Sequence, residues 1–188
     1  MSATPRELAR YGVTAQLAHW LTAVLLVGVF TLGFYMVDLR MSPTKLKLFS
    51  YHKWVGVSIF TLMLLRLVWR WRVPPPALPA TMPVWARRAS EITHRLLYLL
   101  VILVPLSGWL MSSAKGFPTV LFGVLPIPDL LGKNPPLGAA LEQIHWALNK
   151  MLLAVVALHV AAALKHAIVD RDGVLQRMLP AFSARRVG

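Results

Sequence analysis

The chain has 188 residues, of which 57% are hydrophobic and only 14% are charged, and its mean hydropathy is +0.61. Water-soluble domains carry nearer a quarter charged residues, so this composition disfavours a soluble globular enzyme and excludes a disordered chain. The formal charge is +13, but nucleic-acid-binding proteins of that charge are much less apolar, so no nucleic-acid partner is expected. The absence of cysteine excludes disulfides, thiolate metal sites and covalent haem attachment.

Four apolar stretches are long enough to cross a membrane, since a spanning helix needs about 20 mostly apolar residues. They cover residues 13–37, 51–71, 93–113 and 144–169. A connector with Pro74, Pro75, Pro76 and Pro79 separates the second stretch from the third. A longer loop, Ala114 to Gln143, precedes the fourth, and its apolar middle is expected to rest on the membrane surface. We predict an all-α fold, an integral membrane four-helix bundle formed by residues 1–188 as one domain.

The distribution of basic residues predicts which way the bundle points, because cytoplasmic loops are enriched in Lys and Arg. The thirteen on the side of both termini are Arg6, Arg10, Arg66, Arg70, Arg72, Arg87, Arg88, Arg95, Lys165, Arg171, Arg177, Arg185 and Arg186. The six on the other side are Arg40, Lys45, Lys47, Lys53, Lys115 and Lys133. Both termini are therefore expected in the cytoplasm, with the positive charge also attracting anionic membrane lipid.

Histidines are the informative residues, because the four stretches contain no Asp or Glu and ionisable groups inside a membrane are usually functional. At 1.5 Å per residue, His19 lies about 13 Å past Arg10, and His159 lies about 16 Å before Asp170. These two can face each other in the inner half of the membrane. His52 and His145 begin the second and fourth helices and lie near the outer surface. The depths thus predict two histidine pairs at two heights.

The fourth helix supports this interpretation. His145 and His159 are fourteen residues apart, so they share one face and are separated by about 21 Å along the axis. Two imidazoles on one seam, each matched by a histidine of another helix, indicate two stacked haems in the bundle core. Two neutral histidine ligands saturate each iron, which favours electron transfer over oxygen binding. Without a cysteine attachment motif, the haems are expected to be non-covalent haem b.

Alternatives remain for each of these residues. A single membrane histidine can serve only as a hydrogen-bonding residue between helices. His94 or His166 can replace His159 as the inner ligand, whereas zinc would lack its third and fourth ligands. Arg66, fourteen residues after His52, is a candidate partner of an inner haem propionate or a snorkelling interface residue. Gly28, Gly33, Gly56 and Gly108 can admit a flat macrocycle or serve ordinary helix packing.

Several short motifs resemble the bacterial cytochrome b561 family over about residues 10 to 180. The motifs are His19-Trp20, Tyr51-His52-Lys53, His94 to Tyr98, Gln143 to Trp146, Leu158 to His166, and the tail Asp170 to Pro180. The resemblance implies a dihaem b cytochrome of the bacterial inner membrane that exchanges electrons with the ubiquinone pool. Carried over to this chain, it implies that His19 pairs with His159 and His52 with His145. Relatives act as superoxide:ubiquinone oxidoreductases or as electron carriers for hydrogenases, and one branch is paired with periplasmic isoprenoid-binding proteins.

The resulting hypothesis is electron transfer from a periplasmic-side donor, such as superoxide, through the outer and then the inner haem to ubiquinone. The alternative is a non-enzymatic electron-carrier subunit that serves a periplasmic partner or a dehydrogenase. Two further interpretations of the four spans remain. One is a histidine-based transporter or metal permease, and the other is a structural membrane anchor.

Overall fold

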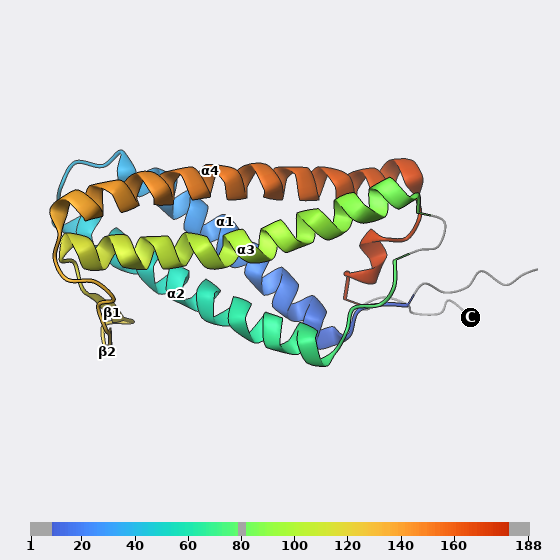
Figure 1. Cartoon of the computed structure of the whole chain (residues 1–188), viewed down its shortest axis with the longest axis horizontal. Helices are drawn as coiled ribbons and strands as arrows, with labels where there is room; N and C mark the ends of the chain where they lie inside the picture. The colour runs from blue at the N-terminus through green and yellow to red at the C-terminus, as the bar shows by residue number, and fades with distance from the viewer. Residues whose placement is uncertain (1–8, 79–81, 181–188) are drawn as a thin grey trace, which may run out of the picture.

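Four α-helices run along the long axis of the molecule in the computed structural model, which describes residues 9–78 and 82–180 (Figure 1). They are α1 (Val13–Val37), α2 (Pro43–Arg72), α3 (Val84–Lys115) and α4 (Pro135–Lys165). Each is long and apolar enough to cross a membrane, so the four predicted spans are confirmed. Among the residues used in the predictions, those outside the described part are Arg6, Pro79, Arg185 and Arg186.

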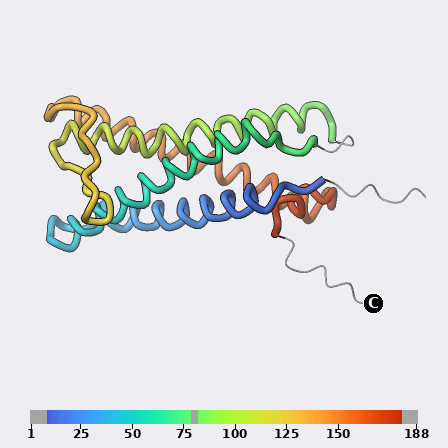
Figure 2. Tube along the Cα trace, turned by 90° about the horizontal axis from the view of Figure 1, so that it is seen from below, coloured from blue at the N-terminus to red at the C-terminus, as the bar shows by residue number. Residues whose placement is uncertain are grey.

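The two ends of the helices differ, as Figures 1 and 2 show. At the terminal end, α1 and α3 begin, α2 and α4 end, and the C-terminal segment folds back. At the opposite end, called the hairpin end, α1 turns into α2 and a small β-hairpin connects α3 to α4. Two short helical turns follow α4 at the terminal end: a π-helical turn (His166–Asp170) and a 3-10 turn (Leu175–Arg177).

Three helices begin well before the apolar stretches within them, which corrects the expectation that His52 and His145 begin their helices. The reason is local capping. Ser42 accepts a hydrogen bond from the backbone N–H of Lys45, and α2 then starts with a proline. Asn134 caps α4 in the same way, again followed by proline. Hydropathy therefore locates the membrane part of each helix, whereas the cap decides where the helix starts.

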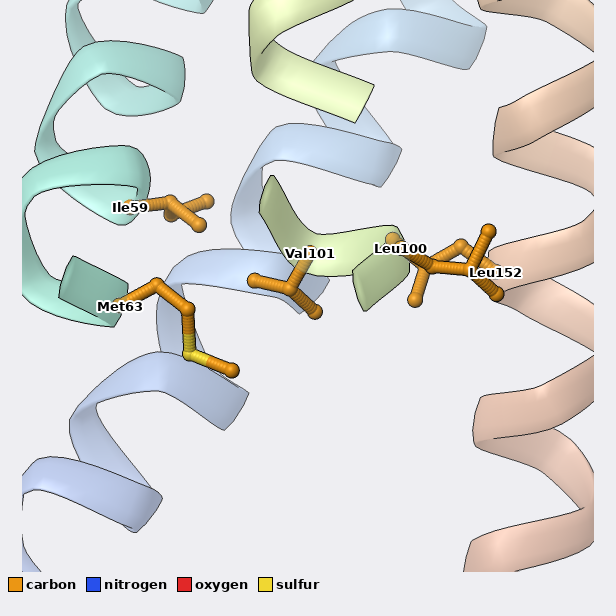
Figure 3. Close-up of a cluster of buried hydrophobic side chains, with 5 residues drawn as sticks. All are labelled: Ile59, Met63, Leu100, Val101 and Leu152. Atoms are coloured by element: carbon orange, nitrogen blue, oxygen red, sulfur yellow. The ribbon is translucent and has the colours of Figure 1, made fainter. Parts of the chain in front are cut away.

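The helices pack as two antiparallel pairs, α1 with α2 and α3 with α4, and α2 joins the pairs by packing on α3. The pairs diverge toward the terminal end (Figure 1). The buried core consists of Ile59, Met63, Leu100, Val101 and Leu152 (Figure 3). Apolar side chains on the outside stay exposed, such as Val24 at 66% and Leu158 at 61%. An apolar exterior around so small a core suits a lipid environment, where every helical backbone group is already hydrogen-bonded.

The loop between α3 and α4 contains a β-hairpin, which the all-α prediction missed. Strand β1 (Thr119–Leu121) pairs antiparallel with β2 (Leu125–Ile127). Phe122 and Gly123, with φ of 52° and 75°, form the tight turn between the strands. Strands of three residues are too short to give a recognisable alternation of apolar and polar residues, so the pattern carried no signal for them.

Side chains from α2 and α3 hold this hairpin over the hairpin end. Trp54 Nε1 donates to the Val120 carbonyl at 2.7 Å, and Trp109 Nε1 donates to the Pro128 carbonyl at 3.1 Å. Lys53 Nζ donates to the Phe117 carbonyl at 2.9 Å. The apolar loop predicted to rest on the membrane surface is thus attached to the helices at β1 and directly after β2.

Arg177 ties the terminal end together. Its side chain is buried at 3% exposure, and its Nε donates to the Ala9 carbonyl at 2.8 Å. Its Nη2 donates to the carbonyls of Pro76 and Ala77 at 3.0 and 2.9 Å. The Arg177 carbonyl in turn accepts the side-chain amide of Gln16 at 3.1 Å. One guanidinium therefore links the start of the chain, the α2–α3 connector and the C-terminal segment.

Arg177→Met is expected to lower the free energy of unfolding by about 2–3 kcal/mol, because three backbone carbonyls lose a charged donor. Thermal unfolding in detergent, followed by circular dichroism, measures the effect. Arg88→Met is the matched control, since Arg88 lies exposed at the start of α3. Equal transition temperatures for the two variants would contradict a structural role for the Arg177 contacts.

Candidate functional site

The histidines of α2 and α4 meet in the hairpin half of the bundle. The ring centroids of His52 and His145 lie 6.5 Å apart, with the rings nearly perpendicular at 85°. His145 Nδ1 lies 3.0 Å from the Val104 carbonyl and 2.9 Å from Ser107 Oγ. Because a carbonyl can only accept, Nδ1 carries the proton and the Nε2 lone pair of His145 stays available for a metal.

Two glycines make room for these imidazoles. A Cβ atom on Gly108 of α3 would lie 3.0 Å from Cε1 of His145, and one on Gly33 of α1 would lie 3.3 Å from Cε1 of His52. By contrast, a Cβ on Gly28 would meet nothing within 4 Å, and one on Gly56 would only reach Pro105 at 4.0 Å. Gly33 and Gly108 thus admit the imidazoles, which neither interpretation of the glycines from sequence anticipated.

A cluster of three histidines occupies the terminal half. The centroids of His19 (α1) and His159 (α4) lie 6.3 Å apart at an interplanar angle of 68°. His94 of α3 approaches His159 more closely, with centroids 5.2 Å apart. His94 Nδ1 lies 2.7 Å from the Ser90 carbonyl, which fixes the proton on that nitrogen and the orientation of the ring. His19 and His159 form one level, and His52 and His145 form another.

Arg66 points into this cluster rather than outward with its neighbours on α2. Its Nη1 donates to Thr22 Oγ1 at 2.8 Å, and its Nη2 lies 3.4 Å from His19 Nδ1. The guanidinium also lies over the ring of Tyr98, 5.7 Å from its centroid. A partly buried cation without a carboxylate among these contacts is available to an anionic group of a ligand.

The pair separations fit one metal ion between two imidazoles. With metal–nitrogen bonds of about 2 Å on opposite sides of the ion, the ring centroids lie roughly 6 Å apart. The separations of 6.3 and 6.5 Å match this value at both levels. The 5.2 Å between His94 and His159 is shorter than such an arrangement requires, so these two residues do not form a pair of this kind with each other. His52 Nδ1 is buried and forms no hydrogen bond of ordinary geometry within the described part of the chain.

His166 lies outside both levels, on the π-helical turn. Its Nδ1 lies 2.6 Å from Asp172 Oδ2 and 3.2 Å from Asp170 Oδ2. Within the described ranges, these three residues are the only set of three or more potential ligands whose donor atoms all lie within 4.8 Å of one another. Lys165 already pairs with both oxygens of Asp170 at 2.6 and 2.7 Å. The three histidines of the terminal half do not form such a set, so a zinc site there lacks a compact ligand group.

Sequence reasoning missed Ser107 and Lys150. Ser107 carries no motif, and only the packing of α3 on α4 brings its hydroxyl to His145. Lys150 lies within the fourth span, so it belongs to neither side of the membrane and the count of basic residues on the two sides does not include it. Its ammonium lies 5.5 Å from the ring centroid of Phe34 and 5.6 Å from that of Trp146. The signal that identifies Lys150 is a charge in the middle of a mostly apolar helix, far from the charged residues near its ends.

Comparison with known proteins gives a family match and several relatives. Residues 10–181 match the family described as prokaryotic cytochrome b561. Cytochrome b561 homolog 2 of Escherichia coli (strain K12) is 34% identical over 90% of this chain and 91% of its own length. A probable superoxide oxidase CybB of Yersinia pestis is 31% identical over 86% and 91%. Cytochrome b561 homolog 1 of Escherichia coli (strain K12) is 26% identical over 91% and 97%.

Gly108→Ala is expected to lower the haem bound per chain by up to one, because the added methyl group would displace the His145 ring that lies 3.0 Å from its position. Helix propensity alone predicts no loss of haem, and it predicts that the helix becomes more stable by about 1 kcal/mol when alanine replaces glycine. The pyridine haemochrome spectrum of the purified variant measures the haem content. Gly28→Ala is the matched control, and an equal haem content in both variants would rule out a role for Gly108 in positioning His145.

Proposed function

Because the chain belongs to the prokaryotic cytochrome b561 family, we propose that its one domain is a dihaem cytochrome carrying electrons from a periplasmic-side donor to ubiquinone. Family membership by itself implies b-type haem and electron transport in a membrane. The observation that carries the finer proposal is the recurrence of one imidazole arrangement, at separations of 6.3 and 6.5 Å, at two levels of the bundle.

In this proposal, His52 with His145 and His19 with His159 are the pairs that would hold two non-covalent haems. Arg66 is the proposed partner of a propionate at the terminal-half level, where its guanidinium lies inside the bundle beside His19. The haems supply one-electron redox chemistry when bound. An iron held by two imidazoles would transfer electrons rather than bind oxygen, so this set of residues suits electron transfer.

The rest of the chain orients these ligands and excludes water from between them. The Val104 carbonyl and Ser107 hold the His145 ring in one tautomer. Ile59 and Leu152 belong to the buried apolar cluster of Figure 3. They follow His52 and His145 by seven residues, which places them between the two levels. A dry apolar layer at that point keeps the two levels separate and the local dielectric constant low.

We assign the terminal end to the cytoplasm and the hairpin end to the periplasm of a bacterial inner membrane. The excess of basic residues at the terminal end supports this orientation. Superoxide as the donor is supported by the relative described as a probable superoxide oxidase. Lys45, Lys47 and Lys53 gather at the start of α2 at the hairpin end, where positive charge favours the arrival of an anion.

The purified chain alone, given superoxide and decylubiquinone, is expected to convert two superoxide ions, one quinone and two protons into two dioxygen molecules and one quinol. Quinol formation and superoxide loss are measured together by absorbance. His52→Ala is expected to abolish this turnover, since it removes a proposed ligand of the level nearer the donor. Absence of turnover by the chain alone, with haem reduction restored by a periplasmic partner or a dehydrogenase, would contradict the oxidoreductase and favour the electron-carrier alternative.

A further inference from the structure

Lys150 is a charged residue within the membrane span of α4. The charged residues on either side of it in this helix are Glu142, eight residues earlier, and Lys165, fifteen residues later. At 1.5 Å per residue, the Lys150 backbone lies about 12 Å and about 22 Å from them along the helix axis. A cation at such a position is costly in a membrane and is usually functional.

Two aromatic rings from different helices hold its ammonium group. Lys150 Nζ lies 5.5 Å from the ring centroid of Phe34, on α1, and 5.6 Å from that of Trp146, one turn earlier on α4. Both distances are within the range in which a cation is attracted to the face of an aromatic ring. Phe34 in turn stacks on Phe30, with centroids 6.1 Å apart. Contacts within the protein thus place the ammonium between α1 and α4.

The same two rings place the ammonium at the height of the hairpin-half level, which is formed by His52 and His145. Trp146 directly follows His145 in the chain. Phe34 directly follows Gly33, where an added Cβ would lie 3.3 Å from His52 Cε1. Neighbouring residues of a helix differ by only 1.5 Å in height. The Lys150 backbone is further along α4, but helical side chains lean back toward the helix N-terminus, which here is the direction of His145.

No carboxylate offsets this charge in the part of the chain that the structure describes. Lys150 forms no ion pair there, and Glu142 is already paired with Lys115 at 2.7 Å. The terminal-half level has a comparable cation in Arg66, whose Nη2 lies 3.4 Å from His19 Nδ1. Each level of histidines therefore has one cation near it.

We propose that Lys150 raises the reduction potential of the centre held by His52 and His145. The inference rests on the proposed function, because it requires a haem at this level. A reduced iron carries one positive charge fewer than an oxidised iron, so a nearby cation stabilises the reduced form. The low dielectric constant of the membrane interior strengthens that effect. The step that Lys150 favours is the transfer of one electron from superoxide, which becomes dioxygen, to the centre nearer the periplasm.

The test is a redox titration, followed by absorbance, of the haem-loaded protein in phosphatidylcholine nanodiscs. Lys150→Met removes the charge and retains the length of the side chain. At a fixed potential, it is expected to lower the ratio of reduced to oxidised haem by roughly tenfold at one level, equivalent to a midpoint about 59 mV lower. The other haem is expected to keep its midpoint. Repeating the substitution in His159→Ala, which is expected to retain only the hairpin-half haem, identifies the haem that shifts.

Two further variants separate the charge from the side chain and from the overall charge of the protein. Lys150→Arg keeps a cation at the position and is expected to retain both midpoints. Lys133→Met is the matched control, because it removes the same charge from an exposed position in the loop before α4. Both midpoints are expected to be unchanged in this control, since water screens a charge at that place.

A lower midpoint of the hairpin-half haem in Lys150→Met, with both midpoints retained in Lys150→Arg and Lys133→Met, supports the proposal. Unchanged midpoints in Lys150→Met overturn it, leave the proposed function intact and favour a contact of Lys150 with a lipid phosphate. An equal shift of both haems, the same shift in Lys150→Arg, or loss of a haem in Lys150→Met also overturns it. Fewer than two haems in the unaltered protein would instead contradict the proposed function itself.

Discussion

A seven-residue spacing shared by α2 and α4 determines what the bundle can hold. Along α4, His145, Leu152 and His159 follow one another at steps of seven, and α2 repeats the order with Ile59 and Arg66 after its own histidine. Seven residues make nearly two helical turns, so each set stays on one face. Leu152 and Ile59 are 1% and 3% exposed. Along the bundle axis, α2 and α4 thus each present a polar residue near the hairpin end, an apolar residue in the middle and a second polar residue nearer the terminal end.

The ends of the molecule keep these levels in register. At the hairpin end, Trp54 and Trp109 attach the β-hairpin to the helices that carry or adjoin His52 and His145. At the terminal end, the divergence of the two helix pairs is offset by Arg177, which joins segments far apart in the chain. Between the ends, only a small core holds the helices together, so a ligand bound between facing imidazoles would add to the stability of the fold.

Much of this arrangement could be predicted from the sequence. The thickness of the bilayer fixes the length of each apolar helix, and with it the depth of each residue along the helix. Four apolar runs gave the four spans, and counting residues from charged ends gave the depths at which His19 faces His159 and His52 faces His145. Depth says nothing about lateral packing, so it left open which of His159, His94 and His166 meets His19, and the structure places both His19 and His94 beside His159. The contacts of Arg177 link residues 168 positions apart, which no local pattern encodes.

The most direct test of the two-level account is redox spectroscopy of the haem-loaded chain, compared with His52→Ala and His159→Ala. The account predicts two six-coordinate b-type haems per chain in the unaltered protein. Each variant should lose one of them and retain the other, because the levels use separate ligands. A single haem in the unaltered chain, or the same haem content in all three proteins, would contradict it.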